Sequence, residues 1–264
     1  QALRGEKLDV VWNLTLAANI ISANVRFGDI EAIENVKGVK SVVIETQYEP
    51  CVVNKEEAND PNMATASLMI GTPAAYAAGY TGAGSRVAVI DTGVDTDHQS
   101  FAPGGLEYAL RLNAENEGMT YDEYAAKLDL LDAAEIADKL DQMNIKGKGF
   151  TAEELYVNMK VGFGFNYVDS DLDITHDNDG QGEHGSHVEG IAAANGYIPQ
   201  GDTYVPALEA VGMQGVAPDA RIITMKVFGK GGGAYDSDYM VAIEDAIVLG
   251  ADSVNLSLGS AAPG

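Results

Sequence analysis

The chain has 264 residues, 46% of them hydrophobic, and a formal net charge of −24 from 40 acidic and 16 basic side chains. This length and apolar content are enough to bury a substantial core, whereas the acidic balance disfavours binding to a nucleic-acid phosphate backbone through clustered Lys and Arg. Cys51 is the single cysteine, which argues against a disulfide framework or a cysteine-rich metal site, and no apolar run in this segment is long enough to span a membrane.

The first fifty residues predict a small unit of strands and helix. Apolar runs at residues 10–16 and 20–27, joined by a short polar turn, predict a hairpin. Residues 29–36 carry apolar side chains at helical spacing and predict a short helix, and residues 39–44 predict a further strand. A charged stretch at residues 54–61 follows and has the composition of a linker.

Beyond this stretch, residues 66–78 predict a helix. The apolar run at residues 87–90 then ends abruptly on Asp91, as a buried parallel strand does when it delivers a carboxylate to the mouth of a sheet. The long stretch from 101 to 167 contains a predicted helix at 121–143, whose apolar residues recur at helical spacing between acidic residues.

The next segment, residues 169–180, is acidic and suggests a cation site, because alternate acids can supply the oxygen ligands that calcium prefers. The EF-hand template fails here, since it requires Gly and Glu where this chain has Ile174 and Gly180. Two interpretations stay open, a structural calcium site or a solvated acidic loop that positions residues 181–186. For the chemistry itself the sequence predicts no required cofactor.

His184 stands at the head of a small-residue helix, and the order of Asp91 before His184 is the order of the subtilisin triad. Glycine-rich turns at 79–84 and 215–220 precede the Asp91 strand and a predicted strand at 221–227, and a Ser-Leu-Gly segment lies near the end. Together these motifs resemble the subtilisin-like serine proteases, the subtilases. The resemblance covers about residues 63–264, apart from the stretch 101–167.

This resemblance implies a doubly wound, mostly parallel α/β sheet, incomplete here, preceded by part of a small α+β, ferredoxin-like pro-domain. The implied organisation is a pro-domain remnant at 1–50, a linker with a processing site at 51–62, and the first part of the catalytic domain at 63–264. An ordinary N-terminal subdomain is the alternative for residues 1–50.

By the same resemblance, His184 is the general base and Asp91 the acid that orients it. An extended substrate would lie between two edges, as in strand addition. The residues implied for these edges are Gly231, Gly232 and Gly233 on one side and Ser257, Leu258 and Gly259 on the other, with Phe228 and Tyr235 flanking the first edge.

The sequence also departs from the family pattern. The Gly-Thr-Ser-Met-Ala block that carries the nucleophile does not occur, so we expect the serine beyond this segment and expect the segment alone to be inactive. Ser186 replaces the usual threonine and keeps its hydroxyl. Glu189 replaces the usual alanine on a helix normally buried, so its carboxylate is expected either to face the insertion or to be paired. His187 is expected to be a packed or hydrogen-bonded structural residue. The insertion 101–167 resembles that of the large cell-envelope subtilases of Gram-positive bacteria and is either a lid beside the cleft or a surface decoration.

The sequence therefore predicts a secreted or cell-envelope serine endopeptidase that acts on protein or peptide substrates and is inhibited by its own pro-domain. Its last strand, 253–258, would present an unpaired edge through which the segment could self-associate. A catalytically dead subtilase homologue that acts as a binding or scaffold module is the alternative. An α/β hydrolase or a nucleotide enzyme is disfavoured, because neither a Gly-x-Ser-x-Gly elbow nor a Gly-x-Gly-x-x-Gly turn after a strand is present.

Overall fold

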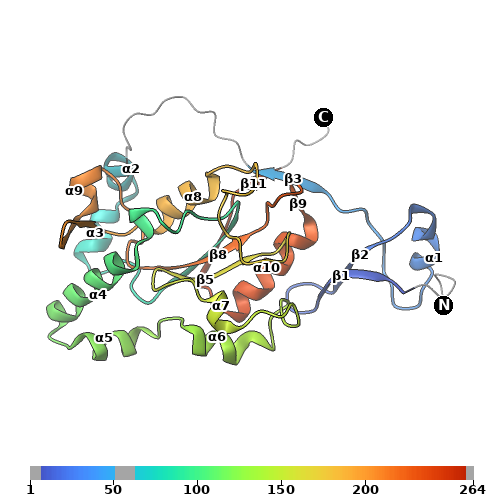
Figure 1. Ribbon diagram of the computed structural model, residues 1–264, viewed down its shortest axis with the longest axis horizontal. Helices are drawn as coiled ribbons and strands as arrows, with labels where there is room; N and C mark the ends of the chain where they lie inside the picture. Colours follow the sequence, from blue (N-terminus) through green and yellow to red (C-terminus); the bar gives the residue numbers. More distant parts are fainter. Residues whose placement is uncertain (1–6, 51–62, 260–264) are drawn as a thin grey trace.

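The computed structural model describes residues 7–50 and 63–259 and is built around a four-stranded parallel sheet (Figure 1). The strands stand in the order β10-β4-β8-β5, with bounds β4 (Arg86–Asp91), β5 (Val161–Asn166), β8 (Arg221–Lys226) and β10 (Ser253–Leu256). The predicted α/β fold with a parallel sheet is confirmed. β4 lies between β8 and β10, so its carboxyl end opens where the strand order reverses, the usual ligand position in such sheets.

Both faces of the central strands of this sheet are covered, which explains the continuous apolar run of β4. Ala88, Ile90 and Ile223 belong to the larger core cluster, with side chains from α10 (Asp236–Val248). Strand residues whose side chains point to the other face of the sheet, such as Ile222, pack with Ala193 of α8 (His184–Ala193). Because successive strand side chains alternate between faces, Asp91 lies on the α8 face.

The connection between β4 and β5 is helical, with α4 (Pro103–Glu117), α5 (Tyr121–Leu128), α6 (Ala133–Leu140) and α7 (Ala152–Leu155). The single helix predicted at 121–143 is wrong. Asp129 has a φ of 50° and ends α5, and the Asp132 side chain accepts the N–H of Glu135 to begin α6. The predicted stretch 101–167 also contains β5, so the helical segment proper covers residues 103–155 and is called the inserted segment below.

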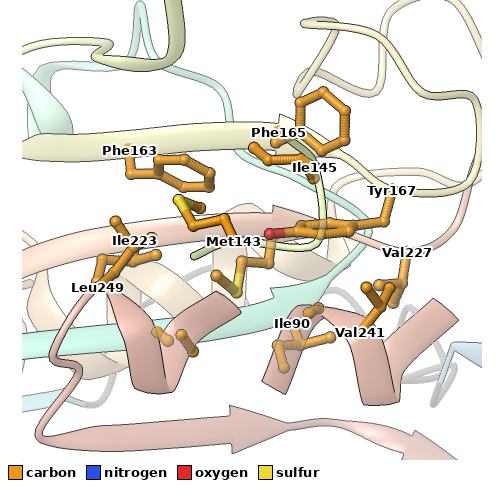
Figure 2. Packing of buried hydrophobic residues seen from close by; sticks show 14 of the residues in the cluster. Ile90, Met143, Ile145, Phe163, Phe165, Tyr167, Ile223, Val227, Val241 and Leu249 are labelled. Carbon is orange, nitrogen blue, oxygen red and sulfur yellow. The ribbon is translucent and has the colours of Figure 1, made fainter. Parts of the chain in front are cut away.

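The inserted segment packs against the sheet and α10. Figure 2 shows Met143 and Ile145 among the aromatic side chains of β5. At the amino end of β4, the Arg86 guanidinium contacts both carboxylate oxygens of Glu135, at 2.6 and 2.7 Å. Because Asp91 ends the same strand, this anchor lies about 16 Å along the strand from Asp91. α6 is therefore fixed at the opposite end of the strand from the predicted catalytic acid.

The N-terminal unit is defined here as residues 7–50. β1 (Asp9–Leu14) and β2 (Ile20–Asn24) form the predicted antiparallel hairpin, followed by a 3-10 turn, η1 (Phe27–Asp29), and the predicted short helix α1 (Ile30–Glu34). The strand predicted at 39–44 is wrong, because this stretch has no strand partner and its apolar residues Val43 and Ile44 are exposed. The chain instead forms β3 (Gln47–Pro50), which belongs to a different sheet from the hairpin.

The remaining elements surround the sheet. They are α2 (Met63–Ile70), α3 (Thr72–Ala77), η2 (Gln99–Phe101), β6 (Tyr197–Gln200), β7 (Thr203–Pro206), α9 (Ala207–Val211), β9 (Ala234–Tyr235) and β11 (Leu258–Gly259). The helix predicted at 66–78 is divided in two by Gly71, which has a φ of 83°. The predicted linker 51–62 lies outside the described residues. Within the described ranges, no helix has the length and apolar character needed to cross a membrane.

Candidate active site

The structure brings the two predicted catalytic residues together. His184 begins α8 and Asp91 ends β4, and His184 Nδ1 lies 2.7 Å from Asp91 Oδ1. Asp91 Oδ1 also accepts the backbone N–H of Thr92 at 2.7 Å. The Asp91 side chain is 1% exposed and that of His184 is 14% exposed, so a buried carboxylate orients an imidazole that still reaches the surface.

Small residues on both blocks allow this approach. A Cβ on Gly93 would lie 2.1 Å from the carbonyl oxygen of Ile174, and a Cβ on Gly185 would lie 2.2 Å from the carbonyl oxygen of Gly93. The Thr92 hydroxyl accepts the N–H of Gly185 at 2.8 Å and donates to the carbonyl of Gly182. The end of β4 is thereby joined directly to the first turn of α8, and any side chain at either glycine would separate them.

A buried ion pair lies next to this junction. Lys226, which is paired with Asp91 in the register of β8 and β4, is 1% exposed. Its ammonium group donates to the carbonyl oxygen of Thr92 and forms an ion pair with Asp179 at 2.7 Å. Asp179 thus ties the acidic loop to the Asp91 turn. Sequence reasoning missed this pairing, because Lys226 lies in no motif with a catalytic role and Asp179 stood out only as part of the acidic segment 169–180.

Glu189, the unusual residue of α8, is fully buried and accepts the Thr224 hydroxyl at 2.9 Å. Burial raises the pKa of Glu189 well above its usual range, which favours its protonated form. It is therefore paired, one of the two outcomes expected from the sequence. Ser186 Oγ accepts the N–H of Asp95 at 2.8 Å, so the hydroxyl retained at this position makes a hydrogen bond. His187 is exposed, so of the two expectations for this residue, packed or hydrogen-bonded, the packed one is wrong.

The predicted substrate edges meet a segment of the same chain. β3 lies between β9 and β11 in an antiparallel three-stranded sheet, visible near the top of Figure 1. Leu258 and Gly259 pair with Pro50 and Glu49. At the other edge the pairing residues are Ala234 and Tyr235, which pair with Tyr48 and Gln47.

The predicted glycines of the first edge are therefore offset from the strand itself. A Cβ on Gly233 would lie 2.0 Å from the carbonyl oxygen of Tyr48, whereas Gly231 has no atom near its missing side chain. Gly232 lies near the Gln47 amide, and the Ser257 hydroxyl donates to Asn255. Phe228 is fully buried in the core and is not available to line a pocket, whereas Tyr235 is 44% exposed.

The acidic loop is held by internal hydrogen bonds. The carboxylate of Asp169 accepts the Asn166 side chain and the N–H of Lys230, and that of Asp173 accepts Thr175 and Asn178. Burial alone would raise the pKa of Asp173, but these hydrogen bonds outweigh it and lower the pKa. Within the part of the chain that the structure describes, no group of three or more His, Cys, Asp or Glu residues is arranged to hold a metal ion.

Comparison with known proteins identifies the family. Residues 82–264 match the Subtilase family. The chain is 34% identical over 246 residues to the PI-type proteinase of Lactococcus lactis subsp. cremoris, covering 92% of this chain and 10% of that protein. It is 28% identical over 243 residues to the minor extracellular protease Vpr of Bacillus subtilis (strain 168), covering 88% of this chain and 22% of Vpr. It is 32% identical over 182 residues to the C5a peptidase of Streptococcus pyogenes serotype M3, covering 69% of this chain and 12% of that peptidase.

The chain thus spans between 10% and 22% of the length of these relatives. Both the Asp91 block and the His184 block lie inside the matched residues. The chain belongs to the subtilase family.

Proposed function

We propose that this chain is part of a serine endopeptidase in which His184 is the general base and Asp91 the acid that orients it. The observation that carries the proposal is the 2.7 Å contact between His184 Nδ1 and the buried Asp91 carboxylate. A carboxylate in this position holds the imidazole in the tautomer with its proton on Nδ1, which leaves Nε2 free to accept a proton. Family membership supports the same roles.

In the proposed reaction a serine hydroxyl attacks the carbonyl carbon of a peptide bond. Nε2 of His184 takes the hydroxyl proton and then delivers it to the leaving amine, while Asp91 stabilises the imidazolium that forms between these steps. The serine is expected outside the 264 residues. These side-chain groups require no cofactor. An extended peptide would bind between β9 and β11, where main-chain hydrogen bonds are available to both of its edges.

The N-terminal unit is proposed to be an inhibitory pro-domain. Its last strand, β3, already occupies the two edges at which we expect a substrate. The alignment with the lactococcal proteinase covers 92% of the chain, so the likeness extends well before residue 82, where the family match begins. Cleavage within the linker would then leave β3 in place as a product-like strand.

An extracellular location is proposed, secreted or in the cell envelope, because one relative is itself named an extracellular protease. The edge of β10 is a second proposed contact. β10 is the outermost strand of the parallel sheet, and its Val254 and Leu256 are each 40% exposed. Association with a second copy of the chain, or with a strand from another chain, would cover these residues.

The proposed catalytic roles are tested in the intact enzyme by His184→Ala and Asp91→Asn, with His187→Ala as a matched control. We expect each of the first two to reduce peptide hydrolysis by about 10⁴-fold, as for the acid in related triads. The control changes an exposed histidine on the same helix and should leave hydrolysis unchanged. Near-normal turnover by His184→Ala or Asp91→Asn would refute the roles. An unmodified intact protein without any hydrolytic activity would instead favour a catalytically dead binding module.

A further inference from the structure

The inserted segment contains a loop, residues 143–148, that lies between α6 and α7 and against the N-terminal unit. Met143 and Ile145 are buried in the same core cluster as Trp12 and Leu14 of β1, and Figure 2 shows the two loop residues beside Tyr167. Because α6 is anchored at the amino end of β4, this part of the segment lies away from Asp91.

One direct contact joins this loop to the hairpin. Trp12 is 4% exposed, and its ring lies 4.4 Å from the Lys148 ammonium on one side and 6.2 Å from the Tyr167 ring. The indole N–H donates to Asp238 of α10 at 3.4 Å. An ammonium over an indole face is attracted by the ring quadrupole. The Lys148 ammonium also donates to Ser170 Oγ at 3.1 Å, which holds it in place.

A second contact runs through a shared carboxylate. Glu244 accepts four backbone N–H groups of the β1–β2 turn, residues 15–18. The side-chain amide of Asn144 donates to the same carboxylate at 3.0 Å, and the Asn144 backbone N–H donates to the neighbouring Asp245 at 2.6 Å. Asn144 therefore fixes the rotamer in which Glu244 receives the turn.

We propose that loop 143–148 is a recognition surface for the N-terminal unit, through which the inserted segment selects the pro-domain of its own chain. The occupant is this unit because it is seated on the loop through Trp12 and on Glu244 through its turn. The biological meaning rests on the proposed inhibitory function, but docking can be measured without proteolysis.

The test uses hydrogen exchange of the Leu16 and Ala17 amides, which donate to Glu244 only in the docked unit. Trp12 is the single tryptophan of the chain, so its emission gives an independent reading of the same contact. Lys148→Ala and Lys148→Glu are compared with Lys146→Ala and Lys146→Glu. Lys146 is exposed on the same loop and its ammonium donates to the carbonyl of Asp141.

We expect Lys148→Ala to speed exchange of the two turn amides about two- to five-fold, the range for a cation–π contact near the surface. Lys148→Glu should speed it further and shift Trp12 emission to longer wavelength. The Lys146 variants should exchange like the unmodified chain, and the Ile223 and Met225 amides of β8 should stay protected in all of them. Exchange unchanged in both Lys148 variants, or changed equally by the Lys146 variants, would overturn the proposal.

A double-mutant cycle separates direct contact from a general effect of charge. In a Trp12→Leu chain, Lys148→Ala should no longer alter exchange of the turn amides, because its partner is gone. A persisting two- to five-fold effect would count against recognition through Trp12. These measurements are independent of catalysis, so an inactive intact enzyme with the expected exchange pattern would refute the proposed function and leave the recognition surface standing.

Discussion

Glu244 is the residue at which docking of the N-terminal unit can be perturbed with least change in shape. Its Oε1 accepts the N–H groups of Leu16 at 2.8 Å, Ala17 at 2.7 Å and Ala18 at 3.2 Å, and Oε2 accepts Thr15 at 3.3 Å. Glu244→Gln keeps the size of the side chain and removes its charge. Its amide nitrogen cannot accept these hydrogen bonds.

The magnitude follows from the two short bonds. A hydrogen bond to a charged group contributes about 1 kcal/mol more than a neutral one. Loss of the charge should thus weaken docking by about 2 kcal/mol, or about 30-fold, with the two longer bonds adding little. Glu244→Ala removes the acceptor altogether and leaves these part-buried N–H groups without their protein partner, so its effect should be larger.

The effect should depend on pH in a defined direction. Burial raises the pKa of Glu244, but the hydrogen bonds from Asn144 and from the turn amides outweigh it, and the net pKa lies below the usual value. A lowered carboxyl pKa means that its contribution is fully present above the unfolded value, near 4.5, and is lost as the pH falls through the folded one. The difference between the unmodified chain and Glu244→Gln should therefore be constant near neutral pH and shrink in acid.

Hydrogen exchange of the Leu16 and Ala17 amides, measured at pH 7 and in acid, checks both statements. Glu209→Gln on α9 is the matched control, because Glu209 is exposed and lies outside the N-terminal interface. The reasoning fails if the two amides of Glu244→Gln exchange at the rate of the unmodified chain. It also fails if the difference in exchange rate between the variant and the unmodified chain grows as the pH falls.

Three further predictions concern the core, processing and the nucleophile. Burial raises the pKa of Asp245 to about 6, so ionising this carboxyl destabilises the folded state as the pH rises from about 4 to 6. In urea unfolding at pH 8, Asp245→Asn should therefore be more stable than the unmodified chain, by up to about 3 kcal/mol. At pH 4 the variant should be no more stable than the unmodified chain. A less stable variant at pH 8 would contradict this. Mass spectrometry of the active enzyme should find its N-terminus between Cys51 and Ala66, and an N-terminus before Gln1 would count against processing. A fluorophosphonate should leave the 264-residue chain unlabelled, and specific labelling of any of its serines would show that the nucleophile is already present.

Of the four parallel strands, β4 could be predicted from its own residues, whereas β5 lay inside the stretch 101–167 and was not predicted as a strand. Residues 87–90 are apolar without alternation, as in a strand covered on both faces, and they end on Asp91. The 121–143 helix failed for a local reason. Asp129 adopts a positive φ and Asp132 supplies a new N-cap, and both effects are compatible with a continuous amphipathic pattern.

β3 could not be predicted from its own residues. Gln47–Pro50 has only four residues, ends on proline and contains no β-branched residue, and its partners lie near positions 234 and 258. Its conformation is decided by two edges that the rest of the chain provides. The apolar residues 39–44, in contrast, have strand propensity but no edge to pair with, so propensity alone predicted the wrong segment.

The buried charges next to the catalytic pair escaped prediction for a related reason. Lys226 and Asp179 are distant in sequence, and each alone would be an ordinary surface residue. Only the fold shows that they pair at 2.7 Å with almost no exposure. The Asp91 and His184 pairing could be anticipated, because it was inferred from the family resemblance and not from spacing.

The geometry of β3 explains why an inhibitory segment needs the rest of its unit. β3 pairs through two residues at each edge, and a net hydrogen bond contributes only about 1 kcal/mol, so the strand alone would compete poorly with a peptide substrate. Trp12 and the turn held by Glu244 add contacts that a substrate lacks. Because β3 and the hairpin belong to one unit, docking of the hairpin raises the effective concentration of β3 at the edges. Weakening either the Lys148 contact or the Glu244 contact should therefore release the substrate edges, although both contacts lie on the hairpin and not on β3 itself.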